Sequence, residues 1–480
     1  MAVWGGFILF VLPAAVWAET QFVPLISVRE RYDTNVLFVN PKLVPGVNVE
    51  DFVTTITPQL IMKSRGGAID INGSGGVIGE IYKNNPSLNY VGFNAALGLG
   101  LTPLVTRVLP RATMDIVGSY QYTPRPPAFL PGSQQSQEQL DPFLRGIQVF
   151  RANTRRYMVG QRAAYRVTPT VSIAESYTYS KFTFGSQLPG TTGLLDTSSH
   201  LFSLAPTIRI SAADVVSNTY TVSAYDQSGI GSFQTYASTV GWSRSWSDTL
   251  FTQAAGGVQL LSSAFSAAGS GTGTSVQNPL ILTPTGTFSM TYSSHTRVLG
   301  EFAETAGQLT GLPQLAGSIM PGGGGPAGSY SLRVSYSYGA FPLLLAGGGL
   351  AKSHVFGLHG TLNVTPSMTI IYGGNFGRND ATGAAQQFSF ESISANGGFN
   401  YRITPALQAG LTYTYTNSYG LGNQGSSSPG QNVTNFLTYS RQVVMLNLVY
   451  AFGGGSQFFQ GESFFGSSGG AGMGPSTGGR

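Results

Sequence analysis

Three arginines between residues 156 and 166 have a spacing that indicates a shared role in binding or attracting solutes. Arg156, Arg162 and Arg166 are separated by even numbers of residues, so their side chains share one face if the segment is an extended strand. The opposite face then carries Tyr157, Val159, Ala163, Tyr165 and Val167. Three guanidinium groups on one polar face indicate a surface that attracts anions.

A second stretch, residues 111–122, alternates in the same way. One face carries Arg111, Thr113, Asp115, Ser119 and Gln121, and the other carries Ala112, Met114, Ile116, Tyr120 and Tyr122. We expect Arg111 and Asp115 to lie on the same polar surface as the three arginines. Two interpretations stay open: the charges bias a water-filled passage toward anionic solutes, or the arginines pair with acidic side chains and hold the fold together.

The other reactive residue types do not form a recognisable site. The four histidines, His200, His295, His354 and His359, are scattered, and the last two are an odd number of residues apart, which places them on opposite faces of a strand. The sequence has no cysteine, no paired-carboxylate motif and no glycine-rich phosphate loop. We therefore predict no catalytic residue, no metal site, no cofactor and no enzyme. The absence of Lys/Arg runs argues against nucleic acid as a partner.

The composition indicates which elements position these charges. Only 9% of the 480 residues are charged, against about a quarter in ordinary soluble proteins, while Gly (65), Phe (29) and Tyr (23) are abundant. Alternating runs such as 111–122 and 406–415 are about ten residues long, the length of a tilted membrane strand. The sequence predicts an all-β fold, a transmembrane antiparallel up-and-down β-barrel. An arginine facing lipid at the bilayer midplane costs about 2 to 4 kcal/mol, so the arginines should face the lumen.

The number of alternating runs predicts about 18 strands, with 16 to 20 possible because residues 329–351 could hold one strand or two. Tight turns are expected at residues 168–169, 247–248, 294–295, 365–366 and 404–405, and long loops at 123–150, 185–199, 264–277, 309–328, 378–387 and 420–434. Short periplasmic turns and long outer loops are typical of bacterial barrels.

A short repeat supports this strand pattern. The sequence from Tyr165 to Pro169 recurs from Tyr401 to Pro405, and each proline is followed by tyrosines eight and ten residues later. Pro24 also has a tyrosine, Tyr32, eight residues after it. We expect these prolines at periplasmic turns and the tyrosines near the outer aromatic girdle. Glu30 and Glu175 do not fit, because they lie on the apolar face; a local bulge or a protein contact would remove them from lipid.

The two ends of the chain have patterns of their own. Residues 1–18 read as a signal peptide cleaved after Ala18, with an N-terminal membrane anchor as the alternative, and the barrel is expected over 19–452. Leu446, Leu448, Tyr450 and Phe452 form the apolar face of the last strand, which is similar to the closing-strand signal that barrel-assembly machinery reads. Residues 453–480 form a Gly/Ser-rich tail that we predict to be disordered.

The start of the expected barrel resembles the opening of a family of outer-membrane β-barrel porins, some of them associated with exopolysaccharide and exosortase loci. The resemblance rests on residues 27–38 (SVRERYDTNVLF), Asp51-Phe52 and residues 57–60 (TPQL). It implies a barrel in the outer membrane of a Gram-negative bacterium, with outer-membrane lipid, assembly machinery and polysaccharide-export components as partners. The sequence thus predicts a porin-like pore or export channel for small hydrophilic solutes or polysaccharide. The alternative is a non-transporting barrel that acts as a surface anchor or assembly partner.

Overall fold

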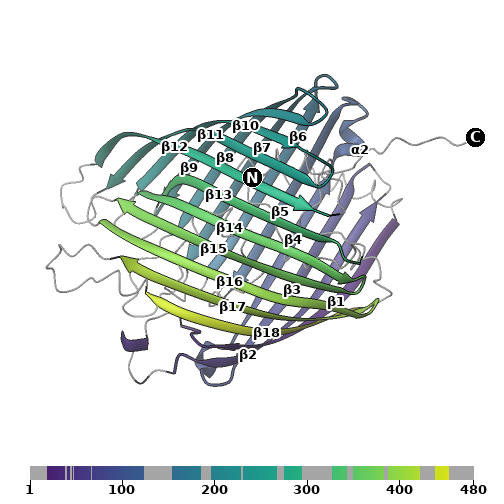
Figure 1. Cartoon of the computed structure of the whole chain (residues 1–480), viewed down its shortest axis with the longest axis vertical. Coiled ribbons are helices and arrows are strands. Elements are labelled where there is room, and N and C mark those ends of the chain that lie inside the picture. Colours follow the sequence, from purple (N-terminus) through teal and green to yellow (C-terminus); the bar gives the residue numbers. More distant parts are fainter. Residues whose placement is uncertain are drawn as a thin grey trace, which may run out of the picture.

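The computed structural model describes most of the expected barrel. The described residues are 19–37, 41–43, 46, 48–65, 68–123, 154–184, 196–228, 231–266, 275–294, 327–342, 350–382, 387–421 and 438–452. They form an antiparallel 18-stranded sheet in which β1 pairs with β2 on one side and with β18 on the other. The sheet is therefore closed, and Figure 1 shows its tilted strands forming a continuous wall. The predicted fold class and strand number are confirmed.

The first nine strands are β1 (Glu19–Asp33), β2 (Asp51–Arg65), β3 (Asp70–Tyr82), β4 (Tyr90–Gly100), β5 (Ala112–Thr123), β6 (Thr154–Arg166), β7 (Val171–Phe184), β8 (Thr197–Arg209) and β9 (Asp214–Gln227). The other nine are β10 (Gly231–Ser245), β11 (Leu250–Ser266), β12 (Ser275–Ser293), β13 (Tyr330–Pro342), β14 (Leu350–Thr365), β15 (Met368–Thr382), β16 (Gln387–Thr404), β17 (Leu407–Leu421) and β18 (Tyr439–Ala451). The helices described are short: η2 (Pro41–Leu43), η3 (Pro86–Leu88) and α2 (Thr102–Val105). No helix among these residues is both long and apolar enough to cross a membrane.

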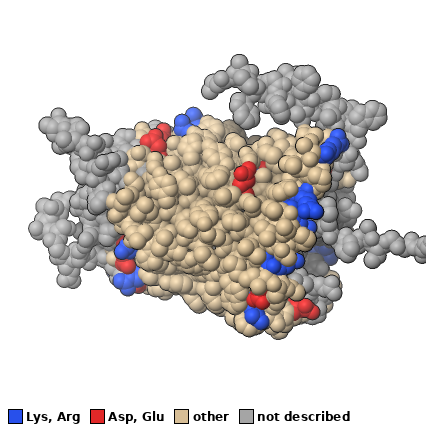
Figure 2. Space-filling view, turned by 90° about the horizontal axis from the view of Figure 1, so that it is seen from above, with Lys and Arg blue, Asp and Glu red and all other residues tan. Residues whose placement is uncertain are grey.

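The two-residue periodicity of the sequence separates an interior face from an exterior face. In β18, buried Val443, Met445 and Val449 alternate with exposed Leu446 and Leu448. Large apolar side chains are exposed on the exterior of strands around the barrel, and Figure 2 shows a broad surface with most charged residues toward its margins. A closed barrel satisfies the backbone hydrogen bonds and has no free edge, and an apolar exterior is stable only in contact with lipid. The protein is a transmembrane barrel of the outer-membrane type.

The connections differ between the two ends of the barrel, but less regularly than expected. Turns of a few residues follow β2, β6, β8, β10, β14 and β16, at the end that holds both termini, and long connections follow β1, β5, β7 and β17 at the other end. At the far end, the β9–β10 connection is short, residues 228–230, and the predicted long loop at 378–387 is wrong, because β15 continues to Thr382 and β16 begins at Gln387. At the end that holds the termini, the β4–β5 connection spans residues 101–111 and the β12–β13 connection spans residues 294–329. The predicted tight turn at 294–295 and outer loop at 309–328 fall mostly on residues 295–326, which lie outside the described residues. Of the predicted loop, Gly328 is described, and its N–H donates to the backbone oxygen of Asn363 at 2.7 Å, at the end that holds the termini.

The proline repeat forms two equivalent turns. Thr168 Oγ1 accepts a hydrogen bond from the N–H of Val171 at 2.9 Å, and Thr404 Oγ1 accepts one from Leu407 at 3.0 Å. Each threonine side chain thus closes the turn that its proline starts. Pro24 differs from the expectation, since it lies within β1, paired with Leu60. Proline has no N–H to donate to the sheet, but its carbonyl accepts the N–H of Phe452 at 2.9 Å.

The predicted domain limits stay predictions, because both boundaries adjoin residues that the structure does not describe. The first strand begins at Glu19 and the last ends at Ala451. Residues 1–18 and 453–480 lie outside the described residues, so the signal peptide and the disordered tail stay predictions. Residues 329–351 hold one strand, β13, together with the start of β14.

Candidate functional site: the interior face of the barrel

The predicted arginine stripe lies on the interior face of β6. Strand pairing places Arg162 opposite Asp115 and Arg156 opposite Gln121, while Arg166 ends the strand opposite Ser172 of β7. The Arg156 guanidinium lies 5.0 Å from the centre of the Phe182 ring. The structure thus brings Asp115 next to the stripe. A role for these residues toward a passing solute stays a prediction.

Arg111 lies just before β5 and is less closely associated with the stripe. Its Nη1 donates a hydrogen bond to the backbone oxygen of Val167 at 3.2 Å, and the N–H of Arg166 donates to the backbone oxygen of Arg111 at 3.0 Å. Arg111 therefore joins the start of β5 to the turn after β6. It remains exposed at the end of the barrel that holds the termini.

Three strands between β6 and β18 also carry an arginine on the interior face. Arg209, Arg333 and Arg402 occupy interior positions in β8, β13 and β16, opposite Val215, His359 and Gln408 respectively. We call Arg156, Arg162, Arg166, Arg209, Arg333 and Arg402 the basic wall. Sequence reasoning missed the last three because each is isolated in its own strand. Once the strand limits are known, two-residue alternation identifies all of them.

The acidic residues are distributed differently from the arginines. The interior carboxylates of the described strands are Asp33, Asp51, Asp70, Glu80 and Asp115, all on β1 to β5. The acids of the described later strands, Glu175, Asp214, Asp226, Asp380 and Glu391, alternate with interior residues and face outward. From β6 to β17, the described interior face therefore carries positive charge without a carboxylate.

Part of the interior is accessible to water. Gln121 on β5, Arg162 on β6 and Arg333 on β13 point inward and are nevertheless exposed. Exposed side chains on an interior face adjoin open space rather than packed protein. Barrels of 16 to 18 strands are wide enough to leave an aqueous channel.

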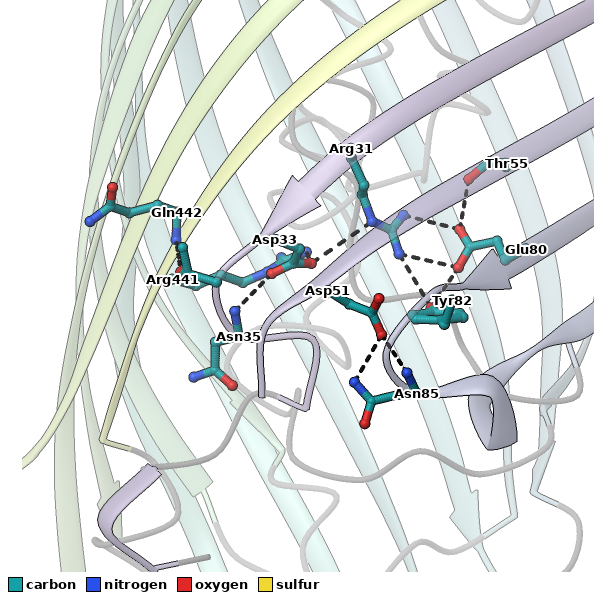
Figure 3. Close-up of polar contacts among 11 residues, drawn as sticks. Arg31, Asp33, Asn35, Asp51, Thr55, Glu80, Tyr82, Asn85, Arg441 and Gln442 are labelled. Atoms are coloured by element: carbon teal, nitrogen blue, oxygen red, sulfur yellow. Dashed lines mark hydrogen bonds and ion pairs between the residues drawn. The ribbon is translucent and has the colours of Figure 1, made fainter. Parts of the chain in front are cut away.

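A buried charged network occupies the interior where the first and last strands meet, and Figure 3 shows its residues. Arg31 of β1 donates from Nη1 and Nη2 to the two carboxylate oxygens of Glu80 of β3, at 3.0 and 3.2 Å. The Tyr82 hydroxyl donates to Glu80 at 2.6 Å, and Thr55 of β2 adds a third donor at 3.3 Å. Arg31 and Glu80 are each 1% exposed.

The same network crosses the closing pair of strands. Asp33 of β1 accepts hydrogen bonds from Arg441 of β18, from Nε at 2.9 Å and from Nη2 at 2.6 Å. It lies 3.8 Å from Arg31 Nε and accepts the backbone N–H of Asn35 at 3.0 Å. We call Arg31, Asp33, Glu80, Tyr82 and Arg441 the closure network. Its two guanidinium and two carboxylate groups balance in formal charge.

Only the part of this network that lies on β1 could be inferred from the sequence. Arg29, Arg31 and Asp33 alternate and so indicate a charged interior face on β1. Their partner Arg441 lies about four hundred residues later along the chain, and only closure of the barrel brings it near Asp33. Pairing of the first strand with the last was expected, but not its register.

The histidines occupy separate places, as the odd spacing of His354 and His359 predicts. His354 faces outward and pairs with the Tyr336 hydroxyl at 3.0 Å, whereas His359 faces inward and pairs with Asn375 at 3.2 Å. His200 faces outward beside Tyr177, at 2.8 Å, and His295 lies outside the described residues. Within the described part of the chain, no cluster of three or more His, Cys, Asp or Glu side chains could hold a metal ion.

The residues predicted as the closing-strand signal lie on the exterior. Leu446, Leu448, Tyr450 and Phe452 are all exposed on one face, with the Tyr450 and Phe452 rings edge to face at 4.7 Å between centres. This face is directed toward lipid. Recognition of these residues by assembly machinery stays a prediction.

Comparison with known proteins gives a likeness in architecture at low similarity. No family model and no curated protein matches the chain. Among solved structures, Pseudomonas aeruginosa OccK3 (OpdO) has 8% identity and a TM-score of 0.42 over 92% of this chain and 97% of its own. P. aeruginosa OccK2 (OpdF), in complex with glucuronate, has 8% identity and a TM-score of 0.43, over 90% and 98%. Acinetobacter baumannii OccAB3 has 10% identity and a TM-score of 0.39, over 90% and 99%. These likenesses concern the fold alone.

Proposed function

We propose that this barrel is a passive outer-membrane channel for small hydrophilic solutes and that the basic wall makes it prefer anions. The observation that supports this is the separation of interior charge: carboxylates lie on β1 to β5, and the described interior from β6 to β17 carries arginines without them. Charge that lines a low-dielectric passage concentrates ions of the opposite sign.

The non-transporting alternative requires a lumen filled by protein. Exposed interior side chains such as Arg162 and Arg333 favour the channel over that alternative. Planar-bilayer recording separates the two, because a channel gives stepwise conductance and a sealed barrel gives none. Absence of conductance from correctly folded protein would favour the anchor or assembly role.

Anion preference is tested by the zero-current potential across a KCl gradient. We expect the wild-type potential to have the sign of chloride selectivity, and the combined variant Arg156→Gln, Arg162→Gln and Arg166→Gln to move it toward the value for equal permeability. Arg378→Gln is the matched control, because Arg378 is exterior and forms ion pairs with Asp380 and Glu391 at 3.5 Å. A cation-selective wild type whose potential the triple variant leaves unchanged would contradict the proposal.

Polysaccharide export is a narrower form of the same proposal, and its support is the resemblance of residues 27–60 to barrels associated with exopolysaccharide loci. A chain of sugar hydroxyls would occupy the lumen and interrupt ion flow. Purified exopolysaccharide from the host should then block single-channel current reversibly when added on one side. Current unaffected by the polysaccharide would restrict the cargo to small solutes.

A further inference from the structure

The exterior of the barrel differs between strands β6 to β10 and strands β12 to β18. From β12 to β18, the described outward side chains between the aromatic girdles are apolar, among them Phe288, Met290, Phe356, Leu358, Phe399, Leu411, Leu446 and Leu448. From β6 to β10, the outward face also carries Gln161, Glu175, Asn218 and Ser238. Gln161 and Glu175 lie on the neighbouring strands β6 and β7, Asn218 and Ser238 lie on the neighbouring strands β9 and β10, and Leu204 of β8 lies between the two pairs. We call these four residues together the polar exterior patch.

Glu175 lies at the depth where lipid is most apolar. It is exposed on β7 between Ile173 and Tyr177, which are 39% and 38% exposed on the same face. It follows the turn at Thr170 by about five residues, which at ~3.3 Å per residue and a tilt near 40° is roughly 13 Å, the middle of the ~25 Å apolar band.

The backbone does not turn Glu175 away from lipid. Strand β7 pairs with β6 and with β8 without a register shift across the described residues. This rules out a β-bulge, one of the two explanations that the sequence left open, and a protein contact is the other.

The hydrogen bonding of Glu175 is directed along the exterior surface. Gln161 Nε2 donates to Glu175 Oε1 at 3.1 Å, and lipid tails offer no partner for the remaining polar groups of this pair. Glu30, the other acid on an apolar face, is placed differently. It lies near the far end of β1, three residues before Asp33, and accepts a 2.6 Å hydrogen bond from Thr54.

We propose that the polar exterior patch is an interface with a second copy of this chain. Copies inserted into the membrane in the same direction place their patches at the same depth, which matches polar groups to polar groups around an axis along the membrane normal. The patch is self-complementary, because amides and a hydroxyl both donate and accept while the Glu175 carboxylate accepts. Exposed Phe202 and Val240 add apolar contact area beside it. Polar side chains at matched depth stabilise association between membrane segments.

Single cysteines test the interface directly, because the sequence contains none and any crosslink through one must join two chains. Ala163→Cys places a thiol opposite Glu175 in the strand register, and Ala395→Cys places the matched control on the exterior of β16. In native outer membranes, a short bismaleimide should crosslink the first variant and not the second. No crosslink at Ala163, or equal crosslinking at both positions, would overturn the proposal.

A second variant addresses the role of Glu175 itself. Glu175→Leu should convert the oligomer to single chains when particle mass is measured by native mass spectrometry from lipid nanodiscs. Heat-modifiable migration on gels verifies that the variant barrel has folded. A wild type that is already a single chain, or an oligomer that the variant leaves intact, would overturn the proposal. Neither outcome depends on the ion selectivity of the lumen.

Discussion

The closure network and the basic wall both contain arginines on the interior face of the barrel, but those of the network are buried beside carboxylates and several of those of the wall are exposed. In the closure network, Arg31 and Arg441 are at most 4% exposed and each contacts a carboxylate. On the basic wall, Arg162 and Arg333 are exposed, and the described interior from β6 to β17 lacks carboxylates. Buried charges paired with carboxylates fix the positions of strands, whereas exposed arginines on a face where carboxylates are scarce create a field in the lumen. The same residue type therefore serves structure at one place and, we propose, solute selection at the other.

The largest effect is expected when one partner of the closure network is removed. Glu80→Ala leaves the Arg31 charge buried without its bidentate partner, and breaking such a pair costs about 3 to 5 kcal/mol. The free energy of unfolding from guanidinium titration in lipid or detergent measures this loss.

Glu391→Ala provides the matched control. It removes a carboxylate that contacts Arg378 at 3.5 Å on the half-exposed exterior, and such pairs contribute about 1 kcal/mol or less. Equal losses for the two variants would show that burial does not distinguish the closure network from an exterior pair.

A smaller change is expected when both charges of the central pair are removed together. In Arg31→Met/Glu80→Leu, apolar side chains of similar volume replace the pair, which in other proteins is neutral or stabilising. We expect unfolding free energy within about 1 kcal/mol of wild type, far from the single variant. A double variant as unstable as Glu80→Ala would mean that the lumen around the pair is too wet for apolar side chains.

The smallest effect, a change in ion selectivity, is expected when the one interior acid of the described strands that lies opposite the basic wall is neutralised. Asp115 is the interior acid opposite Arg162, and Asp115→Asn removes its negative charge while it keeps the size of the side chain. The anion-to-cation permeability ratio should rise by roughly twofold, because Arg162 loses a neighbouring counter-charge. Bilayer recordings at low salt measure this ratio, and a fall in the ratio would contradict the assigned sign.

The sequence predicts features that depend on residues near one another in the chain better than features that depend on residues far apart. The interior position of Arg156, Arg162 and Arg166 depends only on alternation within one strand, and the sequence was sufficient. The Arg441–Asp33 contact depends on barrel closure and register, which no local pattern specifies. The long loop predicted at 378–387 was wrong, because polar residues and glycine also occur at the ends of strands, and β15 continues to Thr382 while β16 begins at Gln387.

The central claim is tested most directly by neutralising each region in turn and measuring zero-current potential and unfolding free energy on the same preparations. The stripe variant carries Arg156→Gln, Arg162→Gln and Arg166→Gln, and the network variant carries Glu80→Ala. The account predicts that the first loses anion preference at nearly unchanged stability, while the second loses stability and keeps the preference. If the stripe variant unfolds easily and retains its selectivity, the arginines of β6 are structural and the account is contradicted.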